Sequence, residues 1–263
     1  MSQPSSTLAS FSLTGRTGIV TGANRGLGLE ISRALVEAGA YRVYGFDLPE
    51  TPGPEFVAAA GSLGGRLEYV CADVSQQQSM WKKVQEIAEK EGRLDFCVAA
   101  AGIGASHSCL EYKAEDFERV MSVNCNGVFY TAQACARQMV KFGTEGSIVL
   151  VASMAGSVTL RDAHVTAYQA SKAAVLAIGR SMACELGPKK IRVNTLSPGY
   201  IPTGLTSPFL DIQGVAESWA SQNPLGRLGR PHEIRGAAVW LVSDASTFCT
   251  GSDIIVDGGH RAW

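Results

Sequence analysis

Short apolar runs alternate along most of the chain with longer stretches whose apolar residues recur at helical spacing. The runs are rich in Val, Ile and Leu, as in strands that are buried on both faces of a sheet. They predict strands at 17–21, 41–46, 67–71, 94–99, 147–151 and 191–196. The helical spacing predicts helices over 29–38, 75–92, 113–140 and 166–186, with a loop and a short helix over 49–65. This alternation indicates a doubly wound α/β fold with a parallel sheet.

The alternation continues without an internal repeat or a linker. A chain of 263 residues is within the range of a single α/β domain. We therefore expect one domain over 13–263, preceded by a flexible, Ser-rich arm at 1–12. Residues 203–227 hold two prolines, with Pro202 just before them, around a short, partly apolar stretch, which we interpret as a mobile substrate flap. A static surface helix is the alternative for this segment.

Composition and charge narrow the possible partners. The formal net charge is -1, which gives no electrostatic footprint for nucleic acid. No apolar run is long enough to span a membrane, and residues 1–12 lack the features of a signal peptide. The 7 cysteines form no Cys-x-x-Cys pair, and the 4 histidines show no metal-ligand spacing. We expect a cytoplasmic protein that acts on a small molecule, without nucleic acid, membrane or metal.

A glycine-rich turn joins the first predicted strand to the first predicted helix. Gly22, Gly26 and Gly28 follow the strand at G-x-x-x-G-x-G spacing, rather than the commoner G-x-G-x-x-G. Glycines let the backbone approach a pyrophosphate, and the N–H groups of a helix N-terminus bind it. The arrangement predicts a Rossmann-type dinucleotide site, with a plain glycine turn as the alternative.

An acidic residue follows the second predicted strand. Asp47 stands roughly 20 residues beyond the glycines, where an acid is expected to bind the adenosine ribose of NAD and to repel the extra phosphate of NADP. Arg25, inside the glycine turn, could bind that phosphate instead. We weigh Asp47 more heavily and expect NAD as cofactor, with NADP as the alternative.

Ser153, Tyr168 and Lys172 form the candidate catalytic group. Ser153 follows a predicted strand, while Tyr168 and Lys172 share one helix face about one turn apart. A free tyrosine has a pKa of about 10, but a nearby ammonium lowers it. The three side chains together predict proton transfer at an alcohol or carbonyl oxygen. The Tyr–Lys pair alone would be an ordinary helix-surface pair. Asn124, inside a predicted helix, is either a site residue or a surface residue.

The chain resembles the short-chain dehydrogenase/reductase family from about Leu13 to its end. The resemblance is carried, in order, by TGANRGLG, Asp73, AAAG, Asn124, Ser153, Tyr168-x-x-x-Lys172, Ser197-Pro198-Gly199 and a last strand within TGSDIIVDGG. It implies that Tyr168 is the general acid in reduction and the base in oxidation, with Lys172 lowering its pKa and holding the nicotinamide ribose. It also implies that Ser153 positions the substrate oxygen and that Asn124 supports a water. The cofactor-binding residues that it implies are Gly22, Asn24, Arg25, Gly26, Leu27, Gly28, Asp47, Asp73, Val74, Ala101, Gly102, Tyr168, Lys172, Pro198, Gly199, Ile201 and Thr203.

The chain departs from the family pattern in two places. The usual Asn-Asn-Ala-Gly is Ala99-Ala100-Ala101-Gly102, so amides that normally tie the sheet to the cofactor side are missing. The loop between Ser153 and Tyr168 is longer than usual and is similar to that of fungal-type polyol dehydrogenases and sorbose reductases. It carries Arg161, Asp162 and His164, which would suit a hydroxylated substrate or would simply be solvated. His107 is a further candidate at the pocket edge.

These features together predict an NAD(P)-dependent oxidoreductase that interconverts a secondary alcohol and a ketone. We favour a small polyol or ketose as substrate. The alternatives are a reductase of a bulkier ketone, such as a 3-oxoacyl or secondary-metabolite intermediate, and a catalytically silent dinucleotide-sensing protein. The family resemblance and the terminal Trp263 also predict a homo-oligomer, either a tetramer or a dimer.

Overall fold

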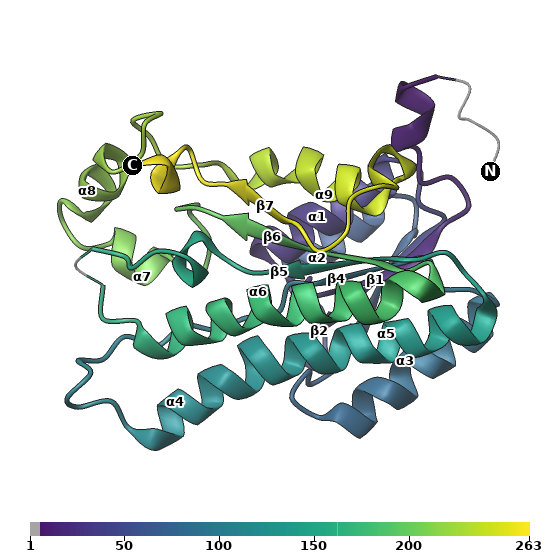
Figure 1. Cartoon of the computed structure of the whole chain (residues 1–263), viewed down its shortest axis with the longest axis horizontal. Coiled ribbons are helices and arrows are strands. Elements are labelled where there is room, and N and C mark those ends of the chain that lie inside the picture. The colour runs from purple at the N-terminus through teal and green to yellow at the C-terminus, as the bar shows by residue number, and fades with distance from the viewer. Residues whose placement is uncertain (1–5, 162) are drawn as a thin grey trace.

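The sheet is parallel and follows the predicted alternation of strands and helices (Figure 1). The computed structural model describes residues 6–161 and 163–263, so Asp162 lies outside the described residues. Within them, seven strands form one sheet in the order β3-β2-β1-β4-β5-β6-β7. The strands are β1 (Thr17–Thr21), β2 (Arg42–Asp47), β3 (Leu67–Cys71), β4 (Phe96–Ala99), β5 (Ser147–Val151), β6 (Arg192–Pro198) and β7 (Asp253–Val256). The doubly wound, Rossmann-type fold predicted from the sequence is confirmed.

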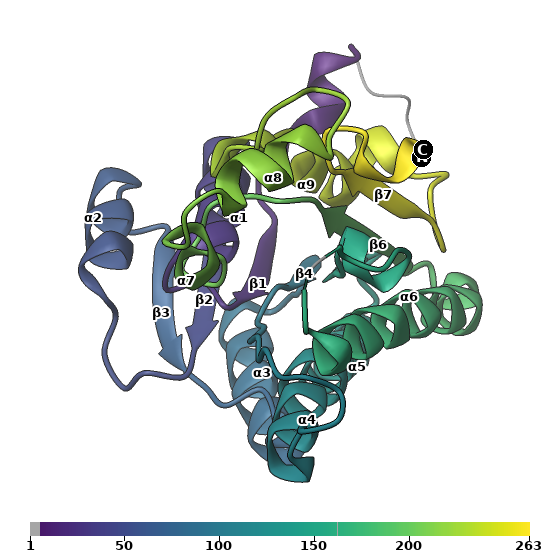
Figure 2. The same ribbon diagram turned by 90° about the vertical axis from the view of Figure 1, so that its left-hand side faces the viewer.

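Helices cover both faces of the sheet (Figure 2). One face carries α1 (Gly26–Glu37), α2 (Pro54–Ser62) and α9 (Arg235–Val242). The other carries α3 (Gln77–Glu91), α4 (Ala114–Met121), α5 (Val128–Phe142) and α6 (Thr166–Leu186). Two short helices, α7 (Ser207–Leu210) and α8 (Val215–Ser221), lie beyond the carboxyl end of β6.

The central strands bury side chains on both faces because successive residues point to opposite sides of the sheet. On β5, Ile148 and Leu150 join the core beneath α3, α5 and α6. Val149 and Val151 join the core beneath α1 and α9. The continuous apolar run of β5 thus serves two separate cores, which places its carboxyl end between the two helical layers.

The predicted helix over 113–140 is confirmed as a helical segment that runs from Ala114 to Phe142, but it is not α-helical throughout. A π-helical segment, Ser122–Gly127, separates α4 from α5. Gly127 packs so closely on the turn after β3 that a Cβ there would lie 2.6 Å from Cγ2 of Val74. The widened turn also brings Asn124 inward, where it is fully buried. Such π-helical turns are frequent at functional sites.

The predicted flap at 203–227 contains α7 and α8. Trp219 of α8 stacks on Tyr200, with ring centroids 4.2 Å apart and planes 9° apart. His260 meets Tyr200 edge-on and bonds Asn223, with its Nδ1 3.1 Å from Oδ1 of Asn223. The far end of the flap is therefore packed against the C-terminal residues. In the predicted N-terminal arm, Leu8–Phe11 forms a 3-10 helix.

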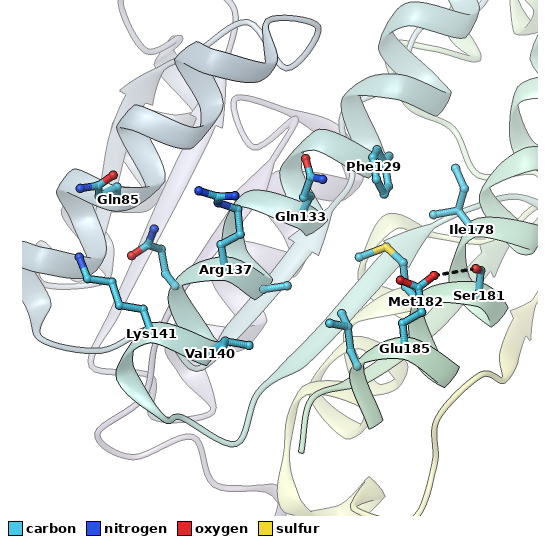
Figure 3. A pocket seen from close by; sticks show the side chains of 13 residues that line it. Gln85, Phe129, Gln133, Arg137, Val140, Lys141, Ile178, Ser181, Met182 and Glu185 are labelled. Atoms are coloured by element: carbon cyan, nitrogen blue, oxygen red, sulfur yellow. Dashed lines mark hydrogen bonds between the residues drawn. The ribbon is translucent and has the colours of Figure 1, made fainter. Parts of the chain in front are cut away.

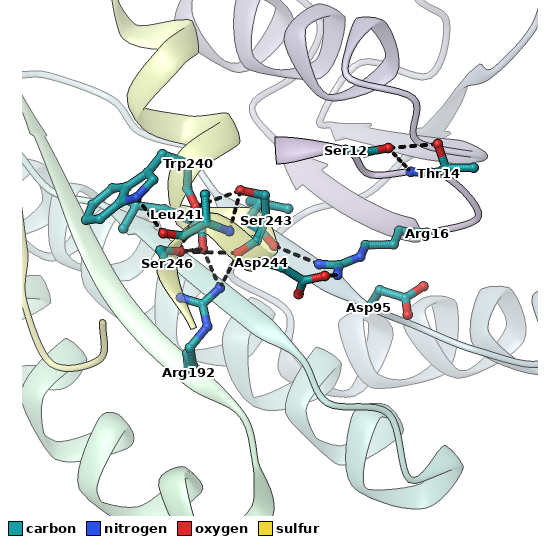
Figure 4. A network of polar contacts seen from close by, with 12 residues as sticks. Ser12, Thr14, Arg16, Asp95, Arg192, Trp240, Leu241, Ser243, Asp244 and Ser246 are labelled. Atoms are coloured by element: carbon teal, nitrogen blue, oxygen red, sulfur yellow. Dashed lines mark hydrogen bonds and ion pairs between the residues drawn. The ribbon is translucent and has the colours of Figure 1, made fainter. Parts of the chain in front are cut away.

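A polar network joins the amino ends of the strands, opposite the end that carries the flap (Figure 4). Arg192, the first residue of β6, donates to the carbonyls of Leu241 and Ser243. Arg16, just before β1, pairs with Asp244 at 2.6 Å. Hydrogen bonds from charged donors are stronger than neutral ones. This network fixes α9 to the sheet and leaves the carboxyl ends of the strands to form a site.

Three further observations bear on possible partners. None of the helices that the structure describes combines the length and apolar character needed to cross a lipid bilayer. Among residues 6–161 and 163–263, His, Cys, Asp and Glu side chains form no group of three or more suited to a metal ion. All of the cysteines are free thiols.

Candidate active site

The carboxyl ends of β1 and β4 meet where the strand order reverses. Open α/β sheets bind their ligands in the crevice at this point. The turn after β1 and the loop after β4 approach so closely that a Cβ on Gly22 would lie 2.8 Å from the Cα of Ala101. Gly22 also has a φ of +68°, which favours glycine. The backbone at this position therefore requires a glycine.

The glycine turn forms a cradle that fits a dinucleotide pyrophosphate. A Cβ on Gly28 would lie 2.1 Å from the carbonyl oxygen of Gly22, so turn and helix are in backbone contact. Gly26 has a φ of +60°, and a Cβ added to it would have the Thr203 side chain as its nearest neighbour, at 3.7 Å. Because α1 begins at Gly26, the N–H groups of its first turn, which includes Leu27, have no acceptor within the helix. These groups are suited to bind phosphate oxygens.

Asp47 lies at the end of β2 beside this cradle. Its carboxylate accepts hydrogen bonds from the backbone N–H groups of Asn24 (2.9 Å) and Leu48 (2.8 Å). The Asn24 side chain in turn accepts from the N–H of Gly53 at 2.7 Å. Asp47 thus holds the glycine turn against the end of β2. Its negative charge remains on the side where an adenosine ribose would lie.

The end of β3 forms the outer edge of the same groove. The Asp73 carboxylate accepts from the N–H and the hydroxyl of Ser75, so this side chain shapes the turn into α3. Val74 is buried against Gly127 of the π-helical segment. Their contact with an adenine stays a prediction of the family resemblance.

Thr21 fills the role of the amides that are missing after β4. Its hydroxyl accepts hydrogen bonds from the N–H groups of Ala100 (3.1 Å) and Ala101 (3.2 Å). The hydroxyl is part of a side chain that is only 1% exposed. The sequence analysis missed Thr21. A short polar side chain at the end of a buried strand could have indicated its role.

Asn124 clamps the loop after β4 to α6. Its Oδ1 accepts from the N–H of Ile103 at 2.8 Å, and its Nδ2 donates to the Ile103 carbonyl (2.9 Å) and the Ser171 hydroxyl (3.1 Å). The Asn124 side chain is therefore buried, which excludes the predicted alternative of a surface residue. Both N–H groups of the amide are thus engaged, and Oδ1 keeps one further lone pair that could accept from a water. Ser171 was not predicted, since one Ser among helix formers carries no signal.

Ser153, Tyr168 and Lys172 converge at the carboxyl end of β5. Ser153 caps the short 3-10 turn Met154–Gly156 by accepting from the N–H of Ala155 at 3.1 Å. Gly156 of that turn lies against the backbone of Lys172, where a Cβ would be 2.8 Å from its carbonyl. The Lys172 ammonium is 5.7 Å from the ring centroid of Tyr168. The structure thus brings together all three side chains that the sequence proposed.

Burial dominates the pKa values of the two titrating groups. It raises the pKa of Tyr168, although hydrogen bonding with Ser153 lowers that pKa in part. It also lowers the pKa of Lys172 to about 8. The Lys172 side chain is 4% exposed, and its Nζ donates to the Val151 carbonyl at 2.8 Å. In this structure burial outweighs the expected lowering of the Tyr168 pKa by Lys172.

The polar loop between Ser153 and Tyr168 lies beside the loop after β4. The N–H of His107 donates to the carbonyl of His164 at 2.9 Å. The His107 ring itself contacts Tyr112 and lies 3.3 Å from the Asp116 carboxylate, so it is committed to the start of α4. Arg161 and His164 are exposed. These two residues, rather than His107, remain candidates for the rim of the site.

The segment after β6 lies across from the glycine turn. Pro198 ends β6, and the Gly199 N–H extends the sheet by donating to Val256 at 2.9 Å. Ile201 is buried, and its carbonyl accepts from the Thr206 hydroxyl. Thr203 faces Gly26, as noted above. The glycine turn, the loop after β4 and this segment thus meet at the carboxyl edge of the sheet.

Comparison with known proteins assigns the family. A family profile described as Enoyl-(Acyl carrier protein) reductase matches residues 22–261. The sorbose reductase sou1 of Schizosaccharomyces pombe is 39% identical over 255 residues, covering 95% of this chain and 97% of that protein. The chain belongs to the short-chain dehydrogenase/reductase family. It is an oxidoreductase that acts on CH–OH groups with NAD(P) as acceptor.

Two other relatives of this short-chain dehydrogenase/reductase have names that refer to sugar chemistry. The galactitol 2-dehydrogenase (L-tagatose-forming) of Cereibacter sphaeroides is 36% identical, covering 96% of this chain and 98% of that protein. A gluconate 5-dehydrogenase from Burkholderia cenocepacia J2315, solved in complex with NADP and tartrate, superposes with a TM-score of 0.91. That structure is 31% identical in sequence and covers 98% of this chain and 100% of the other.

A large surface groove of this short-chain dehydrogenase/reductase lies elsewhere, along the outer faces of α5 and α6 (Figure 3). It has a volume of about 640 Å³ and includes Phe129, Arg137, Ile178 and Met182. None of the residues predicted to bind cofactor or substrate lines it. The chemistry is therefore assigned to the crevice at the carboxyl ends of the strands and not to this groove.

The Thr21 hydroxyl can be tested by removing it with little change of shape. Thr21→Val leaves the N–H groups of Ala100 and Ala101 without their acceptor, and we expect it to lower the free energy of unfolding by about 1–3 kcal/mol. We also expect weaker dinucleotide binding, because the loop that faces Gly22 loses its anchor. Urea unfolding and a cofactor titration measure the two effects. Thr21→Ser keeps the hydroxyl and is the control; equal stability and affinity in the two variants would contradict this role.

Proposed function

We propose that this enzyme interconverts a small polyol and the corresponding ketose, with Tyr168 as the proton-exchanging group and NAD as the preferred cofactor. The observation that supports the chemistry is the convergence of Ser153, Tyr168 and Lys172 at the carboxyl end of β5, next to the glycine turn. A hydroxyl, a phenol and an ammonium together can bind an alcohol or carbonyl oxygen and exchange one proton with it.

In this proposal Tyr168 donates its phenolic proton to the carbonyl oxygen during reduction and takes a proton from the hydroxyl during oxidation. Ser153 holds the same oxygen through its hydroxyl and keeps it within reach of the phenol. The bound nicotinamide supplies or accepts the hydride. The protein thus orients the reacting carbon and oxygen and supplies the proton.

Lys172 supports this exchange through its charge and its position. Its Nζ is fixed by the Val151 carbonyl and lies over the face of the Tyr168 ring. A charged ammonium there favours the deprotonated phenol that remains after proton donation. Asn124 keeps the loop at Gly102 in place. A Cβ added to Gly102 would lie 3.4 Å from Oδ1 of Asn124 and 3.7 Å from Nζ of Lys172, so this loop lies beside both side chains. We assign Asn124 a positioning role in this arrangement.

The preference for NAD is proposed from the charge of Asp47. Its carboxylate is held at the end of β2 by two backbone N–H groups. A second negative charge, such as the extra phosphate of NADP, would meet repulsion there. Arg25 could offset that repulsion only by turning toward Asp47. The related gluconate 5-dehydrogenase was solved with NADP, so the relative affinity of this enzyme for NAD and NADP should be measured first.

The polyol substrate is proposed from the loop between Ser153 and Tyr168 and from the names of the relatives. The loop connects two catalytic residues directly, so Arg161 and His164 lie within a few residues of the site. Exposed donors at this place suit a substrate with several hydroxyls. The related proteins named for sorbose, galactitol and gluconate agree with this chemistry.

A bulkier ketone is the second candidate. The flap carries apolar side chains, of which Leu205 is 37% and Ile212 is 56% exposed. Such residues would suit an acyl chain or a ring system, and the matching family profile is named for an acyl-carrier substrate. A dinucleotide-sensing protein, by contrast, would have no use for Ser153, Tyr168 and Lys172 together.

Initial rates of nicotinamide reduction test the proposal. The panel sets linear polyols beside small and bulky secondary alcohols, each with NAD and with NADP. We expect polyol oxidation with NAD as the fastest reaction, and we expect Tyr168→Phe to abolish turnover while leaving cofactor affinity nearly unchanged. Turnover of bulky alcohols alone would reject the polyol substrate. Equal loss of turnover and cofactor binding in Tyr168→Phe would show that the residue is structural.

The pH dependence follows from the two buried groups. Reduction needs a proton on Tyr168, whose pKa is raised, and a charged Lys172, whose pKa is lowered to about 8. We therefore expect kcat for ketone reduction to fall as the pH rises above about 8, because Lys172 then loses its proton. Alcohol oxidation should instead rise with pH up to that range. A reduction profile that stays level to about pH 10, the ordinary value for tyrosine, would contradict this role of Lys172.

A further inference from the structure

A short strap formed by Thr203–Leu205 lies between the glycine turn and the loop after β4. On the glycine-turn side, the Thr203 side chain lies 3.7 Å from an added Cβ on Gly26. On the opposite side, Cδ1 of Leu205 lies 3.2 Å from an added Cβ on Gly104, in the loop after β4. The strap therefore touches both segments at glycines, where no side chain intervenes.

The strap is internally braced. The Thr206 hydroxyl accepts from the N–H of Thr203 at 2.8 Å and donates to the Ile201 carbonyl at 2.9 Å. The Ser207 hydroxyl donates to the Thr203 carbonyl at 2.9 Å. A segment with these bonds moves as one unit, so the contacts at its edges decide whether it is closed or lifted.

Arg25 makes the third contact of the strap. It is the N-cap residue of α1, and its exposed side chain reaches across to Gly204. A Cβ on Gly204 would lie 3.5 Å from Cζ of Arg25 and 3.6 Å from both Nε and Nη1. Because these three atoms are almost equidistant from that point, the guanidinium plane faces the side of Gly204 on which a Cβ would stand. Within the described part of the chain, Arg25 forms no ion pair with Asp47.

We propose that Arg25 is a positioning residue that latches the strap over the dinucleotide groove and slows cofactor release, instead of selecting between NAD and NADP. The proposal rests on a dinucleotide occupying the glycine turn. A planar guanidinium can lie flat on a peptide backbone, whereas a lysine ammonium is a hydrated point charge on a flexible stem. A latch therefore requires the planar shape of the Arg25 guanidinium, whereas binding of a phosphate would require mainly its positive charge.

Hydrogen exchange of the backbone amides at 199–215 tests the latch in the protein without cofactor. Arg25→Ala and Arg25→Lys should both speed exchange of these amides by about five-fold, the lower end of couplings between linked sites. Exchange in the central strands should not change. Arg180→Ala, at an exposed arginine of α6, is the matched control. Unchanged exchange at 199–215 in both Arg25 variants would overturn the proposal, whatever the cofactor affinities are.

Cofactor affinities separate the latch from a phosphate ligand. We expect the Kd values of NAD and NADP to rise by the same factor in Arg25→Ala and Arg25→Lys, because the strap covers either cofactor. Gly204→Ala should keep affinities close to wild type, since its Cβ would be at van der Waals distance from Arg25. Loss of NADP affinity alone in Arg25→Ala, with recovery in Arg25→Lys, would overturn the proposal. Failure of either cofactor to bind wild-type protein would reject the dinucleotide site, while the exchange result would still test the latch.

Discussion

The close approach of the turn after β1 to the loop after β4 is the constraint on which the site depends. Gly22 permits this approach, and the buried Thr21 hydroxyl fixes it by accepting two N–H groups. The same loop continues into Gly102 and Ile103, which Asn124 clamps to α6. An unbroken series of short contacts therefore runs from the dinucleotide cradle to the helix that carries the phenol and the ammonium.

The buried charge of Lys172 indicates that this part of the molecule has a chemical role. Burying an ammonium is unfavourable unless it is paired, and here the Val151 carbonyl is its hydrogen-bond partner. The burial lowers the pKa of Lys172 to about 8 and raises that of Tyr168. A buried pair with two shifted pKa values in a crevice is a strong indication of acid–base chemistry. The surface groove between α5 and α6 has no such pair.

The fold and most of the site could be predicted from the sequence because both depend on short-range patterns. Apolar runs predicted β1 to β6 to within two residues, whereas β7 was expected only from the family resemblance. The spacing of Tyr168 and Lys172 placed both on one helix face. The π-helical turn at Ser122–Gly127 could not be predicted, since Gly127 packs there on Val74, a residue that is distant in the sequence. The proximity of Arg25 to Gly204 joins residues far apart in the chain, so the sequence offered only a phosphate ligand as the alternative role of Arg25.

Transfer of hydrogen from substrate carbon to cofactor tests the central claim most directly. A linear polyol deuterated at its secondary carbons would be incubated with NAD, and the reduced cofactor would be analysed by mass spectrometry. We predict one deuterium on the nicotinamide ring with the wild-type protein and no reduced cofactor with Tyr168→Phe. Unlabelled reduced cofactor, or the absence of reduced cofactor although NAD is bound, would contradict the proposed polyol oxidation.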